Sequence, residues 1–234
     1  MRLFAIGDLH MSGGDDKPMD VFGDQWDRHF FHISENWRNL VHEEDTVLIP
    51  GDISWAMQLK DAERDLREIG NLPGTKILCK GNHDYWWNSI SQVRALLPPS
   101  VHALQHSAAD LGDCVACGTR GWQIPTAEQP PDDRDLKIFR RETERLRLAL
   151  DAAVRIADGR PVVVLMHYPP LLAGEKDTAF TALMEEYGVH TVVYGHLHAQ
   201  GIQSGFTGVY REVHYHLVSC DSIGFTPKEI LIGK

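Results

Sequence analysis

The stretch Lys76-Ile77-Leu78-Cys79-Lys80-Gly81-Asn82-His83-Asp84 joins a short apolar run directly to a turn of polar side chains. The apolar part has the length of a β-strand, and its consecutive apolar positions are typical of a strand that is buried on both faces. Similar runs recur along the chain and predict further strands at residues 3–6, 46–49, 114–117, 162–166 and 191–194. We therefore expect a sheet whose strands lie in the interior of the protein.

Apolar residues at three- and four-residue steps predict helices between these strands, at residues 26–41, 59–69 and 135–158. Alternating strands and helices favour an α/β fold with a largely parallel sheet. From residue 201 onward, Gly-rich turns separate short strands predicted at 213–219 and 229–232, which we expect to be antiparallel. Residues 12–23 and 118–133 are expected to be loops. No repeat or linker interrupts the pattern, so residues 1–234 are predicted to form a single domain.

The composition excludes several classes of protein. The chain has 23 Lys and Arg against 33 Asp and Glu, a formal net charge of −10, which disfavours binding to nucleic acid. No apolar run is long enough to span a membrane, and the apolar start is too short for a signal peptide. Four Cys are too few for a disulfide scaffold of 234 residues. We expect a cytoplasmic protein without membrane contact; the sequence makes no prediction about its oligomeric state.

Side chains that can bind metals follow five of the predicted strands. In open α/β sheets, ligands bind beyond the carboxyl ends of the strands, so we expect these side chains to meet at one edge of one sheet. Residues two apart in an extended segment point the same way, which allows Asp8 and His10 to face one centre. Carboxylate and imidazole ligands without thiolates suit Mn, Fe, Zn, Co or Ni. The candidate ligands are Asp8, His10, Asp52, Asn82, His167, His196 and His198, too many for one ion and suitable for two that share a carboxylate.

These motifs occur in a specific order. Asp8-x-His10, Gly51-Asp52, Gly81-Asn82-His83-Asp84, a single His167 after a strand, and Gly195-His196-Leu197-His198 follow one another along the chain. The chain thereby resembles the calcineurin-like metallophosphoesterases over residues 8–198. The resemblance implies a four-layer α/β/β/α sandwich of two mixed sheets.

The resemblance also implies a role for each motif residue. It assigns one metal to Asp8, His10 and His198, and a second metal to Asn82, His167 and His196. Asp52 would bridge both ions. His83 would touch the phosphate and help the leaving oxygen to depart, and Asp84 would orient the ring of His83. The two ions would be divalent or mixed-valence transition metals, with Mn favoured and Fe or Zn open.

We therefore expect a metal-dependent phosphoester hydrolase, in which a dinuclear centre activates a bridging hydroxide for in-line attack on phosphorus. The compact chain, without a further domain to enclose a monoester, favours a phosphodiesterase that acts on a small phosphoester. A phosphomonoesterase of the same fold and a catalytically silent metal-binding scaffold are the alternatives. A nuclease would need a basic groove or a capping domain, and a lipid-precursor pyrophosphatase would need an apolar helical insertion.

Three further residues are candidates for substrate contact: Arg120, Trp86 and Tyr168. Arg120 follows a predicted strand and could donate to the phosphate, although a surface ion pair explains it equally well. Cys114 and Cys117 would point to opposite faces of a strand, which argues against a redox pair. The remaining histidines are expected to pack or to face solvent: His29, His32, His42, His102, His106, His190, His214 and His216.

Overall fold

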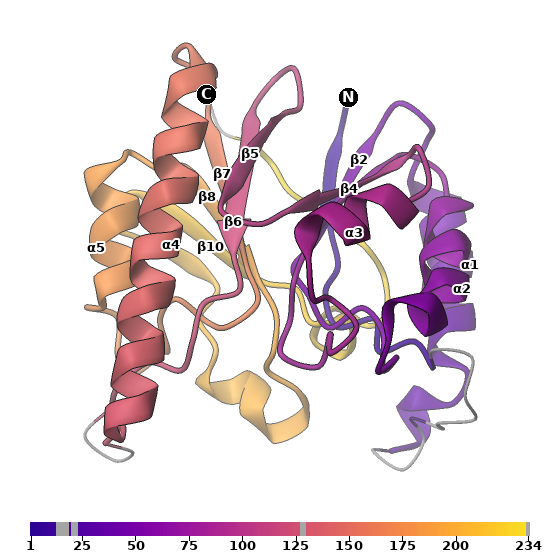
Figure 1. The fold of residues 1–234 in the computed structure, drawn as a ribbon, viewed down its shortest axis with the longest axis horizontal. Helices are drawn as coiled ribbons and strands as arrows, with labels where there is room; N and C mark the ends of the chain where they lie inside the picture. The colour runs from indigo at the N-terminus through magenta and orange to yellow at the C-terminus, as the bar shows by residue number, and fades with distance from the viewer. Residues whose placement is uncertain (13–18, 20–22, 127–129, 233–234) are drawn as a thin grey trace.

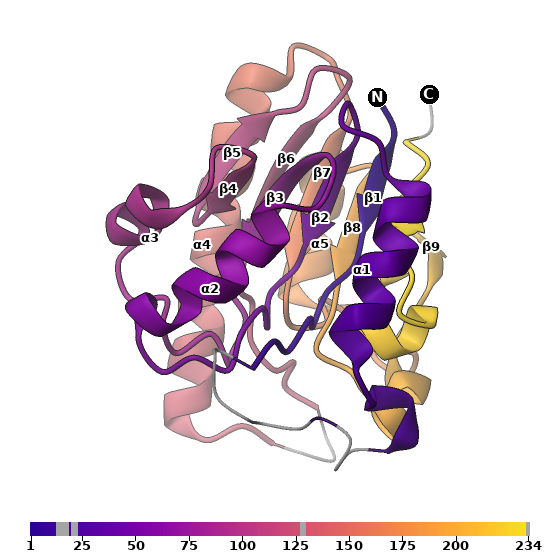
Figure 2. The ribbon, with the colours of Figure 1, turned by 90° about the vertical axis from the view of Figure 1, so that its right-hand side faces the viewer.

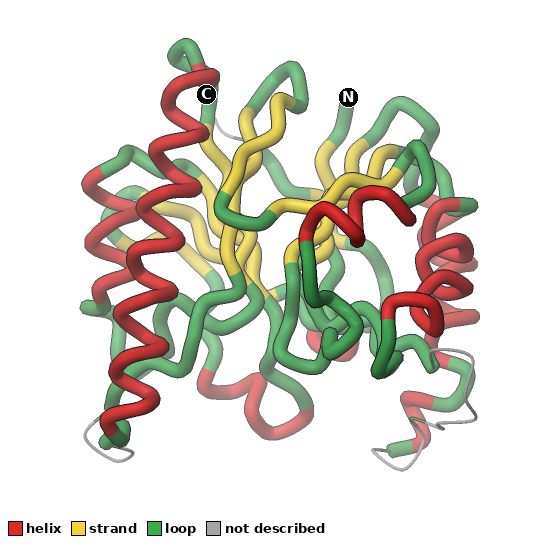
Figure 3. The backbone as a smooth tube through the Cα atoms, viewed as in Figure 1, coloured by secondary structure: helices red, strands yellow, loops and turns green. Residues whose placement is uncertain are grey.

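A computed structural model describes residues 1–12, 19, 23–126 and 130–232 of the chain. Two β-sheets pack face to face in the middle of the molecule, and helices cover the outer face of each sheet (Figures 1 and 3). The expected α/β/β/α sandwich of two mixed sheets is confirmed. No helix in this part of the chain combines the length and the apolar character that crossing a bilayer requires.

The first sheet contains four strands from the N-terminal half of the chain and one strand from its C-terminal end, in the order β11-β1-β2-β3-β4. Four of its strands are parallel, and the short β11 pairs antiparallel with β1. Helices α1 (His29–Leu40) and α2 (Leu59–Gly70) lie on its outer face (Figure 2), and α3 (Ile90–Leu96) precedes β4. The strands are β1 (Leu3–Ala5), β2 (Thr46–Ile49), β3 (Thr75–Cys79), β4 (Val101–Leu104) and β11 (Lys228–Glu229).

The second sheet has the order β5-β6-β7-β8-β10-β9, with β6, β7, β8 and β10 parallel. Helices α4 (Asp133–Ala157) and α5 (Ala179–Glu186) cover it. The antiparallel, hairpin-like arrangement expected after residue 201 is confirmed for β10 with β9 and for β11 with β1. On its other side, β10 pairs parallel with β8, because the β9–β10 hairpin turns the chain back. The strands are β5 (Ser107–Asp110), β6 (Val115–Thr119), β7 (Val162–Met166), β8 (Thr191–Tyr194), β9 (Gly208–Tyr210) and β10 (Val213–Leu217).

Side-chain alternation along each strand builds the layers of the core. In β7, Val163 and Leu165 pack between the two sheets, whereas Val164 packs beneath the helices α4 and α5. Both faces of the strand are therefore apolar, which explains the consecutive apolar residues in the sequence. Cys114 and Cys117 lie in different layers, as expected.

Candidate metal centre

The candidate ligands lie in the loops that follow the carboxyl ends of β1, β2, β3, β7 and β8. The first three strands belong to one sheet and the last two to the other, so the expectation of a single sheet edge is wrong. The loops meet where the ends of both sheets come together, and backbone hydrogen bonds connect them. The amide of Asp8 donates to Gly51 over 3.0 Å, and the amide of Gly195 donates to His167 over 3.2 Å.

Asp8, His10 and His198 form the first group, in which one ligand atom from each residue lies within 4.8 Å of the others. The Nε2 atoms of His10 and His198 are 3.3 Å apart, and Nε2 of His198 is 3.5 Å from Oδ1 of Asp8. Asp221, in the 3-10 turn η4 (Cys220–Ile223), accepts a hydrogen bond from Nδ1 of His198 over 2.8 Å. This bond fixes the orientation of the ring and turns Nε2 towards Asp8 and His10.

Asn82, His167 and His196 form the second group. Oδ1 of Asn82 lies 2.6 Å from Nε2 of His167 and 2.9 Å from Nδ1 of His196. The other ring nitrogen of His167 is 3.0 Å from the carbonyl oxygen of Pro50. Both ring nitrogens of His167 therefore face oxygen acceptors. With the proton on Nδ1, bonded to Pro50, Nε2 and the oxygen of Asn82 would be two adjacent ligands for one metal.

Asp52 lies between the two groups. Its Oδ2 atom is 3.9 Å from Nε2 of His10 and 3.5 Å from Nε2 of His167. Asp8 also approaches the second group, with Oδ1 3.8 Å from Nδ1 of His167. The bridging role that the resemblance gives to Asp52 therefore has a carboxylate in a suitable position, within reach of histidines from both groups.

The charges of the site fit a cationic occupant. Burial, together with the charges of Asp84 and Asp8, raises the pKa of Asp52 well above its ordinary value. Burial also lowers the pKa of His10 and of His196 to about 3, so that both rings are neutral at pH 7. His198 differs, because burial lowers its pKa but hydrogen bonds with Asp221 and Asp8 outweigh this effect and raise the pKa to about 10. A metal bound at this ring would replace a proton, and the buried carboxylates nearby would offset the charge of the metal. The residues present therefore fit the two ions implied by the sequence.

The backbone is strained where it carries these ligands. Asp8, His10, Asp52 and His196 have φ angles of 58°, 43°, 51° and 75°, in the left-handed region that side chains other than glycine rarely adopt. The expectation that Asp8 and His10 converge because the chain is extended is therefore wrong; left-handed turns bring them together. Such conformations persist where surrounding contacts enforce them, and they concentrate at functional sites.

Two glycines allow the ligand loops to pack this closely. A Cβ atom on Gly81 would overlap the carboxylate of Asp52, and one on Gly195 would overlap the carboxylate of Asp8. Glycine at these two positions thus leaves room for a ligand that comes from a neighbouring loop.

The structure corrects the role expected for Asp84. Its buried carboxylate accepts hydrogen bonds from the amides of Asp52, Ile53, Ser54 and Gly81 and from the indole of Trp86, over 2.7 to 3.2 Å. Nδ1 of the His83 ring is buried and makes no hydrogen bond within the described part of the chain. Asp84 therefore ties the loop after β2 to the loop after β3, and does not orient the His83 ring.

The sequence of this chain also matches a known protein family. The sequence profile described as calcineurin-like phosphoesterase matches residues 1–200. The chain belongs to this family. It is thus a metal-dependent phosphoesterase. In agreement, Asp8, His10 and His198 lie close enough together to hold a metal ion, and so do Asp8, Asp52 and His167.

Two solved structures have the same fold as this calcineurin-like phosphoesterase. Phosphopantetheinyl hydrolase from Mycobacterium tuberculosis superposes with a TM-score of 0.60 at 15% identity, covering 99% of this chain and 96% of the other. A protein of unknown function from Aquifex aeolicus gives a TM-score of 0.52 at 14% identity, covering 97% and 95% of the two chains. A search of curated proteins found no match.

The aromatic residues around the phosphoesterase centre differ from those expected. Trp86 is fully buried and donates to Asp84, so its expected contact with substrate is wrong. Instead, the ring of Trp55 stacks on His10 at 4.9 Å and lies 4.4 Å from the ring of His83. Tyr85 is half exposed, with its ring 6.1 Å from that of His83. Trp55 lies three residues after Asp52 in the sequence, and this position could have indicated that its ring packs at the metal centre.

Tyr168 and Arg120, two of the residues expected to contact substrate, line different cavities. Tyr168 packs its ring 4.2 Å from that of His196 and lines a cavity of about 820 Å³ that opens beside this ligand. Arg120 points to a buried carboxylate, with Nη2 3.7 Å from Oε1 of Glu142. Its backbone oxygen accepts hydrogen bonds from the amides of both His167 and Tyr168. Tyr168 therefore lines a cavity together with a candidate metal ligand, whereas Arg120 lines a cavity that none of the candidate ligands lines.

Asp221 is a functional candidate that the sequence analysis missed. It orients His198 and also accepts from the amide of Ala199 over 3.0 Å. Asp221 lies shortly after the end of β10, just as the candidate ligands lie shortly after the ends of their strands. This position in the sequence could have indicated a role for Asp221 at the metal centre.

Proposed function

We propose that this chain is a phosphodiesterase that uses two transition-metal ions held by the seven candidate ligands. The observation that carries the proposal is that the two ligand groups meet at Asp52 beside a cavity that His196 and Tyr168 also line. Mn is the favoured ion, with Fe and Zn as alternatives, because the oxygen and nitrogen donors suit all three. Bound at these groups, the ions would supply positive charge to the phosphoryl oxygens and lower the pKa of an attacking water.

The lining of the cavity favours a diester. Among the described residues that line it, none is Lys or Arg, and two, Asp135 and Glu175, are acidic. A phosphomonoester carries two negative charges near pH 7, whereas a diester carries one and has a second organic group to place. The apolar side chains of Ile124, Leu172 and Leu197 offer a surface for that organic group.

His83 is the proposed proton donor to the leaving oxygen. Its amide donates to Oδ1 of Asp52 over 2.8 Å, which anchors the residue beside the two ligand groups. Trp55 packs against its ring and restricts the directions in which the ring can turn. Burial lowers the pKa of His83 below its ordinary value, so the protonated donor form is favoured on the acid side of neutrality. A general acid in this position contributes about 10²–10⁴-fold to the rate.

The test compares hydrolysis of bis(p-nitrophenyl) phosphate and p-nitrophenyl phosphate by protein that is stripped with a chelator and reloaded with Mn²⁺. We expect metal-dependent hydrolysis with preference for the diester. The His83→Ala variant should bind the same amount of metal and lose about 10²–10⁴-fold in rate. The matched control is His32→Ala, because His32 is an exposed residue of α1. Preference for the monoester would contradict the diesterase, and normal turnover in His83→Ala would contradict the proton donor.

Phosphopantetheinyl compounds should be tested as substrates after the two nitrophenyl esters. A hydrolase named for that group has the same fold as this chain. At 15% identity the similarity extends to the fold alone, so the panel tests the substrate directly.

A further inference from the structure

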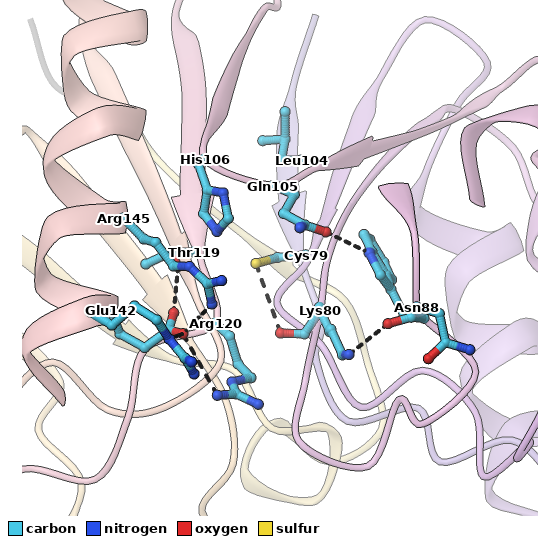
Figure 4. Close-up of a pocket in the computed structure, with 12 residues that line it drawn as sticks. Cys79, Lys80, Asn88, Leu104, Gln105, His106, Thr119, Arg120, Glu142 and Arg145 are labelled. Carbon is cyan, nitrogen blue, oxygen red and sulfur yellow. Dashed lines mark hydrogen bonds and ion pairs between the residues drawn. The ribbon is translucent and has the colours of Figure 1, made fainter. Parts of the chain in front are cut away.

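A second cavity of about 260 Å³ lies beyond the carboxyl ends of β3, β4 and β6, next to the middle of α4 (Figure 4). None of the seven candidate metal ligands lines it. Lys80 borders it from the loop after β3, and Arg120 from the loop after β6. Arg141 and Arg145 border it from α4. The cavity is large enough for far more than one water molecule.

Positive charge dominates this cavity. Four cationic side chains line it, and the single carboxylate among its lining residues is that of Glu142. Glu142 is fully buried, accepts from the hydroxyl of Thr119 over 2.9 Å and pairs with Arg145 over 2.6 Å. One carboxylate therefore balances only part of the charge of three neighbouring guanidinium groups. Lys80 adds to the excess, because its Nζ atom donates only to a neutral acceptor in the described residues, the carbonyl of Trp87.

Donors that an anion could use remain in the cavity. The Nε atom of Arg120 is buried and has no hydrogen-bond partner among the described residues. Buried donors of this kind are rare in folded proteins, because each one costs free energy until an acceptor reaches it. His106, in the tight turn between β4 and β5, has a left-handed φ of 52° and extends its ring towards the cavity (Figure 4). Guanidinium groups bind phosphate oxygens with two parallel hydrogen bonds, which suits this arrangement.

We propose that this cavity is a second anion site, outside the metal centre, that binds a phosphate group. Two sources of the phosphate share this chemistry: a distal phosphate of a substrate held at the metal centre, and free inorganic phosphate. Backbone contacts connect the cavity to the metal centre. The carbonyl oxygen of Arg120 accepts from the amide of His167 over 3.1 Å, and Lys80 begins the loop that carries Asn82. An occupant of this cavity would therefore contact the loop that carries Asn82, and a second loop whose backbone is hydrogen-bonded to that of His167.

The test titrates inorganic phosphate into chelator-treated full-length protein, followed by calorimetry and by the Nε–H signals of the arginine side chains. Chelation removes the phosphate affinity of a metal centre, so that binding reports on this cavity. We expect saturable binding that shifts the Arg120 signal. Arg145→Gln should weaken it at least about tenfold, the effect of one charge-assisted hydrogen bond. Arg141→Gln, at an exposed position that tolerates substitution, should also weaken binding.

The matched control is Arg155→Gln, because Arg155 is exposed on the same helix and does not line the cavity. This variant should bind phosphate as the unmodified protein does. The proposal is overturned if the unmodified protein binds with a dissociation constant above about 10 mM. It is also overturned if Arg141→Gln and a folded Arg145→Gln bind with unchanged affinity. Because the titration needs neither metal nor turnover, a failure of the proposed phosphodiesterase would leave its result unaffected.

Kinetics of the Mn²⁺-loaded protein distinguish the two sources. If the cavity holds a distal phosphate of the substrate, Arg145→Gln raises KM for a diester with a second phosphate group and leaves KM for bis(p-nitrophenyl) phosphate unchanged. If the cavity holds free phosphate, both KM values stay unchanged while the titration still detects binding. Either result supports the second anion site.

Discussion

The contacts of Asp84 lead to a prediction that separates two roles for this residue. In Asp84→Asn, an NH₂ group must replace one of the two carboxylate oxygens. The less costly choice replaces Oδ2, which accepts from the amides of Asp52 and Gly81 over 3.0 and 2.7 Å. Both amides are then buried without an acceptor, at about 1–3 kcal/mol each. The free energy of unfolding should therefore fall by about 2–6 kcal/mol, a large part of the stability of a typical domain.

Urea denaturation with chelator present measures this change without a contribution from bound metal. The control is Asp110→Asn, because Asp110 is 54% exposed and its ion pair with Arg160 should contribute at most about 1 kcal/mol. The binding of metal by Asp84→Asn should weaken together with its stability, since Asp84 positions two loops that carry ligands. Unchanged stability and full metal content, with only a shifted pH–rate profile, would refute this reasoning and restore the role in orienting His83.

Three further outcomes follow from contacts outside the ligand groups. Asp221→Asn should lower metal affinity about 10–100-fold in a metal titration, because His198 loses the carboxylate that orients it; unchanged affinity would contradict that role. Lys76→Met should lower the free energy of unfolding by about 2–4 kcal/mol in urea, because three carbonyl oxygens lose the buried ammonium group. Burial raises the pKa of Asp45, but hydrogen bonds from His42 and Arg2 lower it by more, so that the pKa falls from 3.8 to about 2. Its stabilising effect is complete above pH 3.8 and is lost as the pH falls towards 2, so Asp45→Asn should flatten acid denaturation in that range.

The strands that the sequence predicted well lie inside the sheets. The bounds of β2, β7 and β8 match the prediction, because consecutive apolar residues identify strands covered on both faces. The strands without a prediction, β4, β5 and β9, all lie at sheet edges. Ser107–Asp110, for example, is only partly buried and has little apolar character, so its pairing with β6 comes from tertiary contacts. Helices α3 and α5, of 7 and 8 residues, are too short for periodicity to identify them.

The site shows a similar division. The strand-end motifs identified ligands that the structure brings together, since each motif is local in sequence. The role of Asp84 could not be predicted, because its acceptor oxygens meet amides about 30 residues away, at Ile53 and Ser54. The sequence also did not predict that the ligands come from two sheets. The rule that ligands bind beyond the carboxyl ends of parallel strands concerns a single sheet. Contacts between distant segments thus decide what the loop residues do.

The assembly of the centre across both sheets has a consequence for how the protein is made. The first ligand group combines Asp8 and His10 with His198, so it cannot form until nearly all of the chain has been synthesised. Closing a loop of this length early costs entropy that only the finished sheets repay. Binding of an ion by this group would therefore follow the pairing of the two sheets. An ion would then bind only to chains whose sheets have already paired, and its binding would stabilise the folded state.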